Sequence, residues 1–536
     1  MKRTLIIAAL TAIPAAMSAQ TALDAYSLSG SNQLRGTARF MSMGGAFTAL
    51  GGDLTTLGQN PAGIGVYRYS EVGATLDINF QSVTAITPGS SLNSTQTKAY
   101  CNNVGYIGAV NLHNSVMPFF QWGATYGRKA SFDRVYSGDI TSLNTSLTNY
   151  VAGFTGAEGW TPADLNGYQS GYDPFQSTLA PWTSILMYNA YGINPSSDSS
   201  TDYRGLYNGT PGTGSFDVVE KGYVDEYNIN FGGNIMNMVY WGIGFGIEDI
   251  DYTNSTYYSE SFNKACISGS NGQGFDTGAA SLGLQSWKHL YGTGWNFKVG
   301  VIVKPINEFR IGVAVHTPTY YNLNYQGWAQ TQFDYSNGIN GYYPNTSTYG
   351  TSDDYFTWKY RTPWRLMVGA AGVIGQKGII SVDYEYRPYD KMQVKDYNGN
   401  SYTDVEGDIA TYYKAQNILR LGAEYRLTPN WSLRAGYSYM SSPVTTETRD
   451  GYQAIYTSGP DDTETQPSYS FDGDTQFVTV GIGFHIGAFY ADAAYVWRHA
   501  TSSWHAFTPN DYTAAGPEAS ITDNQSNIVL SVGFKF

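Results

Sequence analysis

The sequence predicts an all-β protein: a transmembrane antiparallel β-barrel of about fourteen strands, with an N-terminal hatch (plug) inside the lumen and long extracellular loops. Three observations favour this fold. Charged residues are only 14% of the 536 residues and aromatic residues 15%, which leaves too few charges to solvate an ordinary globular surface. The mean hydropathy is −0.30, too polar for a bundle of membrane helices. Segments of alternating apolar and polar residues follow one another from Glu71 to the end of the chain.

The first residues have the pattern of an exported protein. A basic start is followed by a short apolar run and by the small residues Ser18 and Ala19, as in a signal peptide. The run is too short to span a membrane as a helix, and no later run reaches about 18 apolar residues. We therefore expect residues 1–19 to be a signal peptide and any insertion into a membrane to use strands.

A segment rich in glycine and small residues precedes the first expected strand. It extends from Gly36 and closes on Asn60, Pro61, Ala62 and Gly63. Because it carries few charges and little periodicity, we expect residues 20–69 to form a hatch within the barrel. Residues 70–536 would form the barrel itself.

Alternation with period two defines the strands, because successive side chains of a strand point to opposite faces. In the last strand Ile528, Leu530, Val532 and Phe534 share one face, whereas Ser531 and Lys535 lie on the other. A soluble sandwich would bury the apolar face, and a membrane barrel would turn it outward. Glycine and charges of both signs on the polar faces, and Trp or Tyr near the strand ends, favour the barrel.

The connections between strands alternate between short and long. The expected strands are 70–81, 102–112, 119–131, 223–235, 239–252, 289–303, 309–324, 356–374, 378–393, 416–427, 431–442, 476–486, 489–501 and 527–536. Short turns at one rim and long loops at the other are typical of outer-membrane barrels, whose long loops are extracellular.

The loop 132–222 is much longer than a connection requires, and such loops are usually functional or disordered. Its apolar residues either contact a hydrophobic ligand or pack as a lid on neighbouring loops. The candidate ligand residues are Phe154, Leu179, Trp182, Ile185, Leu186 and Met187.

Several classes of function are disfavoured. The net charge of −13 argues against a nucleic-acid partner. No Gly-x-Ser-x-Gly or His-Glu-x-x-His motif is present, and no two of the six histidines have metal-ligand spacing. We therefore expect no enzyme activity, no metal and no cofactor. Cys101 and Cys266 would both lie on the extracellular side, where they either form a disulfide or remain unpaired.

The segment from Gly36 to Gly63 resembles the N-terminal hatch of the FadL/TodX (OMPP1) family of outer-membrane transporters. Asn60-Pro61-Ala62 matches the family motif residue for residue, and the small residues from Met43 to Ala49 match in kind. Of the acidic pair often found in the family, only Asp53 is retained.

The resemblance implies passive uptake of small hydrophobic molecules, such as long-chain fatty acids or aromatic hydrocarbons, through the outer membrane of a Gram-negative bacterium. It implies gating by the hatch and lateral exit at a kink in the third strand, where Gly123 and Gly127 are the candidates. The expected partners are the hydrophobic substrate, outer-membrane lipids and the assembly machinery, whose recognition signal the C-terminal Phe536 resembles. A monomer is expected. The alternatives are a haemin-related receptor and a surface adhesin or structural barrel.

Overall fold

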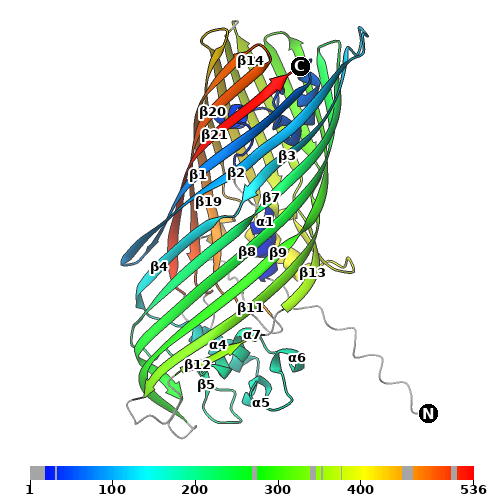
Figure 1. Ribbon diagram of the computed structural model, residues 1–536. Helices are drawn as coiled ribbons and strands as arrows, with labels where there is room; N and C mark the ends of the chain where they lie inside the picture. The colour runs from blue at the N-terminus through cyan, green and yellow to red at the C-terminus, as the bar shows by residue number, and fades with distance from the viewer. Residues whose placement is uncertain are drawn as a thin grey trace, which may run out of the picture.

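Figure 1 shows a computed structural model of the chain, which describes residues 19–29, 33–268, 274–337, 346–351, 354–375, 377–449, 463–508 and 516–536. The strand β1 (Glu71–Thr87) pairs with β2 (Ser90–Asn111) on one side and with β21 (Glu518–Lys535) on the other. The sheet therefore closes on itself. The result is a closed antiparallel barrel of 14 strands, as predicted.

Four of the wall strands consist of consecutive segments separated by short breaks. In chain order the wall continues after β2 with β3 (Phe119–Ser131) and β4 (Arg134–Leu143), β7 (Gly212–Ile235), β8 (Val239–Ser268), β9 (Phe275–Ile306), β10 (Phe309–His316) and β11 (Tyr320–Asn337), β12 (Thr346–Gly350) with β13 (Asp354–Arg361) and β14 (Arg365–Ile374), β15 (Gly378–Pro388) and β16 (Gln393–Asp396), β17 (Ala415–Arg426), β18 (Trp431–Met440), β19 (Tyr469–Ile486) and β20 (Phe489–His505).

The two ends of the barrel differ. Short turns join the strands at one end, the turn end, which is at the top of Figure 1 beside the C-terminus. Long strands and helices occupy the opposite end, the loop end. Several segments that we expected to be loops are strands here: β1 and β2 continue to a hairpin at Thr87 and Ser90. Their outer parts consist mainly of Ser, Thr, Asn and Gln, so neither face is apolar and hydropathy gives no alternation.

The apolar faces of the strands point outward, as predicted. Val480 and Val532 are each 51% exposed on the outer surface, whereas Asp383, Glu385 and Arg420 are buried inside. On β9 the exposed apolar side chains run from Val303 near the turn end to Trp295. We call this level of the outer surface the apolar band. An apolar surface of this kind is stable only against lipid.

The helices lie inside the barrel or over its loop end. They are α1 (Ala19–Ser29), α2 (Ala38–Ser42), α3 (Thr56–Gln59), η1 (Pro61–Val66), α4 (Leu147–Ala157), α5 (Pro162–Leu165), α6 (Pro174–Ser177), α7 (Trp182–Asn189), η2 (Tyr389–Lys391), α8 (Thr403–Tyr412) and α9 (Thr446–Arg449); a small hairpin, β5 (Asn194–Pro195) and β6 (Tyr203–Arg204), follows α7. Within the described ranges, none of these helices is long and apolar enough to cross a membrane. Residues 1–18 of the expected signal peptide lie outside the described residues.

The buried apolar clusters of the described residues lie in three regions inside the molecule. The first belongs to residues 33–69, the hatch segment, in the lumen near the turn end. The second surrounds α1, and the third lies under α4 to α7 at the loop end. Because the wall itself presents mainly polar side chains inward, these clusters are built where chain segments enter the lumen.

Candidate functional site

The hatch segment is tied together by side chains that cap its short helices. The Thr37 hydroxyl accepts a hydrogen bond from the Phe40 amide at the start of α2 and donates to Asp53 at 2.7 Å. The same carboxylate accepts from the Thr55 amide at 2.9 Å. Burial raises the pKa of Asp53. These bonds join the two halves of the segment, so it folds as one unit despite its small size.

Asn60 and Pro61 shape the second half of the hatch segment. The Asn60 side chain accepts from the Ala62 amide at 3.0 Å and donates to the Thr48 carbonyl oxygen at 2.6 Å. Pro61 occupies the first position of η1, where a backbone N–H would have no helical partner. Asn60 is fully buried. The motif therefore both starts η1 and joins it to the preceding loop.

Glycines in the wall allow the hatch segment to approach closely. Gly242 of β8 and Gly300 of β9 lie opposite each other in register. A Cβ at Gly242 would be 2.1 Å from the Pro61 carbonyl oxygen, and one at Gly300 would be 1.8 Å from Asn60 Oδ1. No residue other than glycine fits there. The sequence shows that the polar faces contain glycines. It does not show that Gly242 and Gly300 lie opposite each other, because that depends on the register between two strands.

Polar contacts fasten the hatch segment to the wall. Asp383 accepts from the Thr48 amide at 2.7 Å. On the neighbouring strand β17, Glu424 pairs with Arg39 at 3.0 Å. Further contacts are Arg35 with Asp77 at 3.2 Å, Arg310 with the Leu50 carbonyl oxygen at 2.9 Å and His316 with the Gln59 carbonyl oxygen at 2.8 Å. Some of the inward charges thus anchor the segment, whereas others pair with one another, as Arg420 does with Glu385 at 2.6 Å.

The wall has a seam beside the hatch segment. The ladder between β2 and β3 covers only Asn103 to Asn111 of β2, paired with Gly127 to Phe119 of β3. Beyond it, residues 90–101 of β2 pair with β1, and the following residues of β3 and β4 pair with β7. A bulge on each strand, at Asn102 and at Lys129, marks the start of the seam.

Side chains close the seam in place of backbone hydrogen bonds. Tyr100 donates to Asp133 at 2.9 Å and accepts from Ser131 at 3.1 Å. Lys98 lies 3.6 Å from the same carboxylate of Asp133. Asn103 donates to the backbone carbonyl oxygen of Tyr126 at 3.0 Å. Asp133 is therefore the centre of the links across the seam.

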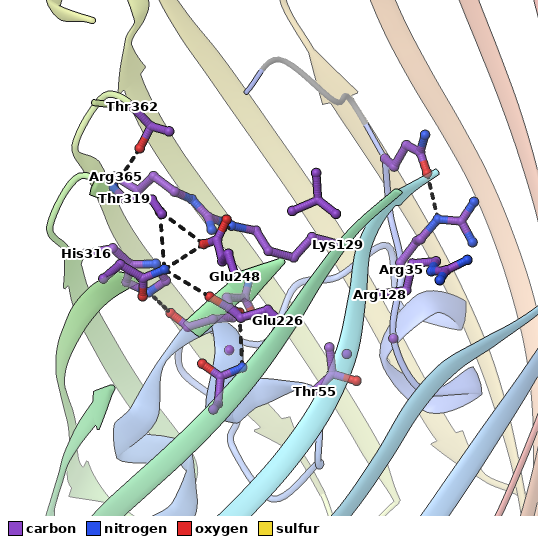
Figure 2. A pocket seen from close by; sticks show the side chains of 18 of the residues that line it. Arg35, Thr55, Arg128, Lys129, Glu226, Glu248, His316, Thr319, Thr362 and Arg365 are labelled. Atoms are coloured by element: carbon purple, nitrogen blue, oxygen red, sulfur yellow. Dashed lines mark hydrogen bonds and ion pairs between the residues drawn. The ribbon is translucent and has the colours of Figure 1, made fainter. Parts of the chain in front are cut away.

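A cavity of about 180 Å³ lies between the hatch segment and the seam. Figure 2 shows Lys129 extending towards Glu248, with Arg35 and Arg128 on the opposite side of the cavity. Lys129 Nζ is 2.6 Å from Glu248 Oε1. Arg128 pairs with Asp225 at 2.8 Å. The cavity is thus polar, with most of its charges in ion pairs.

The two glycines proposed for the lateral gate lie at different places on β3. Gly127 pairs with Asn103 at the last rung before the seam. Gly123 lies closer to the turn end, where its Cβ would be 3.0 Å from Leu57 of the hatch segment. The structure thus puts the first at the seam and the second against the hatch segment.

The apolar loop residues are packed in a lid over the loop end. Phe154, Trp182, Ile185, Leu186 and Met187 are buried in one cluster, and Leu179 is 55% exposed. The N-terminus of α4 is held by Glu260 of β8, which accepts from the Leu147 amide at 2.7 Å and from the Ser146 hydroxyl. Burial raises the pKa of Glu260 to about 7; this residue is far beyond the apolar band.

Between lid and hatch segment, α1 fills an aromatic compartment of the lumen. Its Tyr26 ring packs at 4.7 Å on Tyr413 and at 5.4 Å on Tyr389. Asp24 forms a buried ion pair with Lys288 at 2.6 Å. We expected residues 20–69 to form the hatch. The sequence gives no sign of the aromatic contacts of Tyr26, because its partners are far away in the chain.

The two cysteines are free thiols in the structure, so the disulfide considered above is not formed. Cys101 is exposed on β2 and pairs in register with Leu76, whereas Cys266 is on β8 opposite Thr277. The strands β3, β4 and β7 separate them. Among the described residues, no group of three or more His, Cys, Asp and Glu side chains is arranged to hold a metal.

No protein-family model matches the chain, and no curated protein matches its sequence. Solved structures match its shape. A FadL homologue from Pseudomonas aeruginosa superposes with a TM-score of 0.52 over 94% of this chain and 99% of that one, at 12% identity. The toluene transporters TodX of P. putida and TbuX of Ralstonia pickettii cover the same fractions, with TM-scores of 0.46 and 0.41 and identities of 12% and 14%.

The first of these structures matches this chain over almost the full length of both. By its fold, this chain is a FadL-type β-barrel.

Proposed function

We propose that the chain is an outer-membrane channel for the passive uptake of small hydrophobic molecules, with the loop end facing outward. One observation carries the proposal: the hatch segment fills the lumen near the turn end, while the wall beside it has a seam without a backbone ladder. A solute blocked by the hatch segment would leave through the wall rather than along the axis.

The seam begins within the apolar band, which supports lateral exit. Leu76 and Phe80 of β1 are 47% and 45% exposed, and they pair with Cys101 and Thr97 on the seam edge of β2. A molecule that crossed there would enter hydrocarbon directly. In this proposal Gly127, at the last rung, lets β3 turn away from β2.

The substrate class follows from the apolar clusters along the lumen. Aromatic and aliphatic side chains dominate the lid and the compartment around α1. We propose long-chain fatty acids or aromatic hydrocarbons as substrates, the lid residues Phe154, Leu179 and Trp182 as early contacts, and the chain as a monomer. Export by residues 1–19 and recognition of Phe536 by the assembly machinery belong to the same proposal.

Uptake of a fluorescent fatty acid into proteoliposomes tests the hatch. Asn60→Ala removes a cap and a bond to the Thr48 carbonyl oxygen, which should cost about 1–2 kcal/mol. If the hatch gates uptake, the rate should rise about 5- to 30-fold. Asn324→Ala, on the outer face of β11, is the matched control.

Two results would contradict the proposal. Equal uptake by Asn60→Ala and the intact protein would remove the role of the hatch. Large steady ion currents through the intact protein would indicate an open porin. Heat-modifiable gel mobility shows that each variant is folded.

A further inference from the structure

A strip of aromatic side chains crosses the outer surface of β9 and β11 towards the loop end. The aromatic strip consists of Trp328, Trp287, His289 and Tyr291. The rings of Trp287 and Trp328 are 6.3 Å apart and nearly parallel, at 23°. His289 lies 6.0 Å from Trp287 and stacks on Tyr291 at 4.7 Å. Four rings thus form a continuous surface over two neighbouring strands.

The strip faces away from the lumen. The side chains between its members, Ser286, Lys288 and Leu290, are buried inside the barrel. By the alternation of a strand, Trp287, His289 and Tyr291 must point outward. Tyr291 is 39% exposed there.

The strip lies too far from the apolar band to be its interfacial girdle. The girdle is at Trp295 and Tyr320, stacked at 4.9 Å. One level further out, the outward positions of three neighbouring strands are polar, namely Asp249, Thr293 and Asn322. Trp287 is about eight residues further along β9, which is about 27 Å along the strand at about 3.4 Å per residue. With a strand tilt of about 40°, Trp287 stands about 20 Å above the girdle and Tyr291 about 10 Å above it, so the strip extends outward from the headgroup level of the bilayer.

Polar groups surround the strip. His289 Nε2 is 3.1 Å from Asp251 Oδ2. Nearby, the Gln326 amide donates to the exposed hydroxyl of Tyr355 at 2.7 Å. Flat ring faces beside carboxylate, amide and hydroxyl groups match a sugar, which has an apolar C–H face and a rim of hydroxyls. The carboxylates disfavour a phosphorylated or otherwise anionic ligand.

We propose that the aromatic strip binds neutral sugar residues of the glycan that projects from the outer leaflet beside the barrel. This inference rests on the proposed placement in an outer membrane, because the height of the strip identifies the ligand only there. The long β8, β9 and β11, which extend far towards the loop end in Figure 1, then serve to hold a surface within the glycan layer.

Binding of labelled sugars to the purified protein in detergent micelles tests the proposal by fluorescence anisotropy. One probe is dephosphorylated core oligosaccharide released from lipopolysaccharide, and the other is maltoheptaose, a free glucan. The variant is Trp287→Ala with Trp328→Ala. The control is Trp431→Ala, which removes an exposed tryptophan whose ring lies 4.8 Å from that of Phe484, near the turn end.

We expect the intact protein and Trp431→Ala to bind the core oligosaccharide, and the double variant to bind at least tenfold more weakly. Binding of maltoheptaose with the same loss would identify a general sugar surface, which also supports the strip. Undiminished binding by the double variant, or none by the intact protein, overturns the proposal. So does a dimer of the intact protein that the double variant abolishes. Fatty-acid uptake by the same preparations distinguishes failure of transport from failure of sugar binding.

Discussion

Neighbouring strands are held together by different interactions in two parts of the wall. Between β8 and β9 the ladder runs from Val239 to Ser268, with one irregularity near the loop end. Between β2 and β3 it stops at Asn103, and side chains bridge the remaining edges. A barrel normally leaves no unpaired edge, because exposed backbone groups in a membrane are costly.

The difference indicates which part of the wall would separate most easily. A ladder of backbone bonds must break cooperatively, whereas a few side-chain bonds can exchange one by one. The stable wall of β8 and β9 also carries Gly242 and Gly300, which receive the Asn60-Pro61 turn. The hatch segment thus contacts the continuous ladder of β8 and β9 and lies beside the interrupted ladder of β2 and β3.

Gly300→Val should have the largest effect, because it disrupts the contact between the hatch segment and the continuous ladder of β8 and β9. The new side chain would occupy the position of Asn60 Oδ1, 1.8 Å from the Cβ site. We expect a loss of about 3 kcal/mol of stability and a displaced hatch segment that raises ion conductance in planar bilayers.

Gly372→Val is the control for this substitution. Its Cβ would meet nothing closer than the Glu308 carbonyl oxygen at 4.0 Å. A folded Gly300→Val barrel with the conductance of the intact protein would show that the hatch segment does not depend on this contact.

Asp133→Ala should have a smaller effect, confined to the seam. It removes the partner of Tyr100, Ser131 and Lys98 at once, at a cost of about 1–3 kcal/mol. We expect faster amide exchange in residues 91–101 of β2 and faster fatty-acid uptake, with β8 and β9 unchanged.

The matched control for the seam is Asp249→Ala. Asp249 also accepts a bond from a tyrosine, Tyr223 at 3.2 Å, but it does so across the continuous ladder of β7 and β8. Equal changes in amide exchange for the two variants would mean that the seam is no weaker than the rest of the wall.

Glu260→Gln should have the smallest effect, at the loop end of the rigid wall. The folded pKa of about 7 lies above the ordinary 4.5, so the protonated form stabilises the lid. That contribution is complete below pH about 4.5 and is lost as the pH rises through 7. We expect proteolysis of residues 144–190 to accelerate as the pH rises from about 4.5 to about 7 and to level off above that, in the intact protein only. The same acceleration in Glu260→Gln would assign it to another group.

Much of the barrel was predictable from particular residues. Ile528, Leu530 and Val532 alternate with polar residues, and that pattern needs no knowledge of the rest of the fold. The strand ends near the loop end were not predictable in the same way. Polar residues on both faces, as in Ser90 to Gln96, leave no apolar periodicity from which a strand can be recognised.

The candidate site was predictable only in part. The small residues and Asn60-Pro61 located the hatch segment, because its composition is a local property. The links of Asp133, the ion pair of Asp24 with Lys288 and the closeness of Gly300 to Asn60 join residues far apart in the chain. No spacing within the sequence encodes which of them meet.

By itself, the sequence determined the class of fold and the outward direction of the apolar faces. These depend on periodicity and composition over a few residues. Only the tertiary structure decided where the wall is unpaired, which glycines receive the hatch segment and that Cys101 and Cys266 stay apart. Those features depend on register between strands, and a single bulge such as that at Asn102 changes the register without any visible change in the sequence pattern.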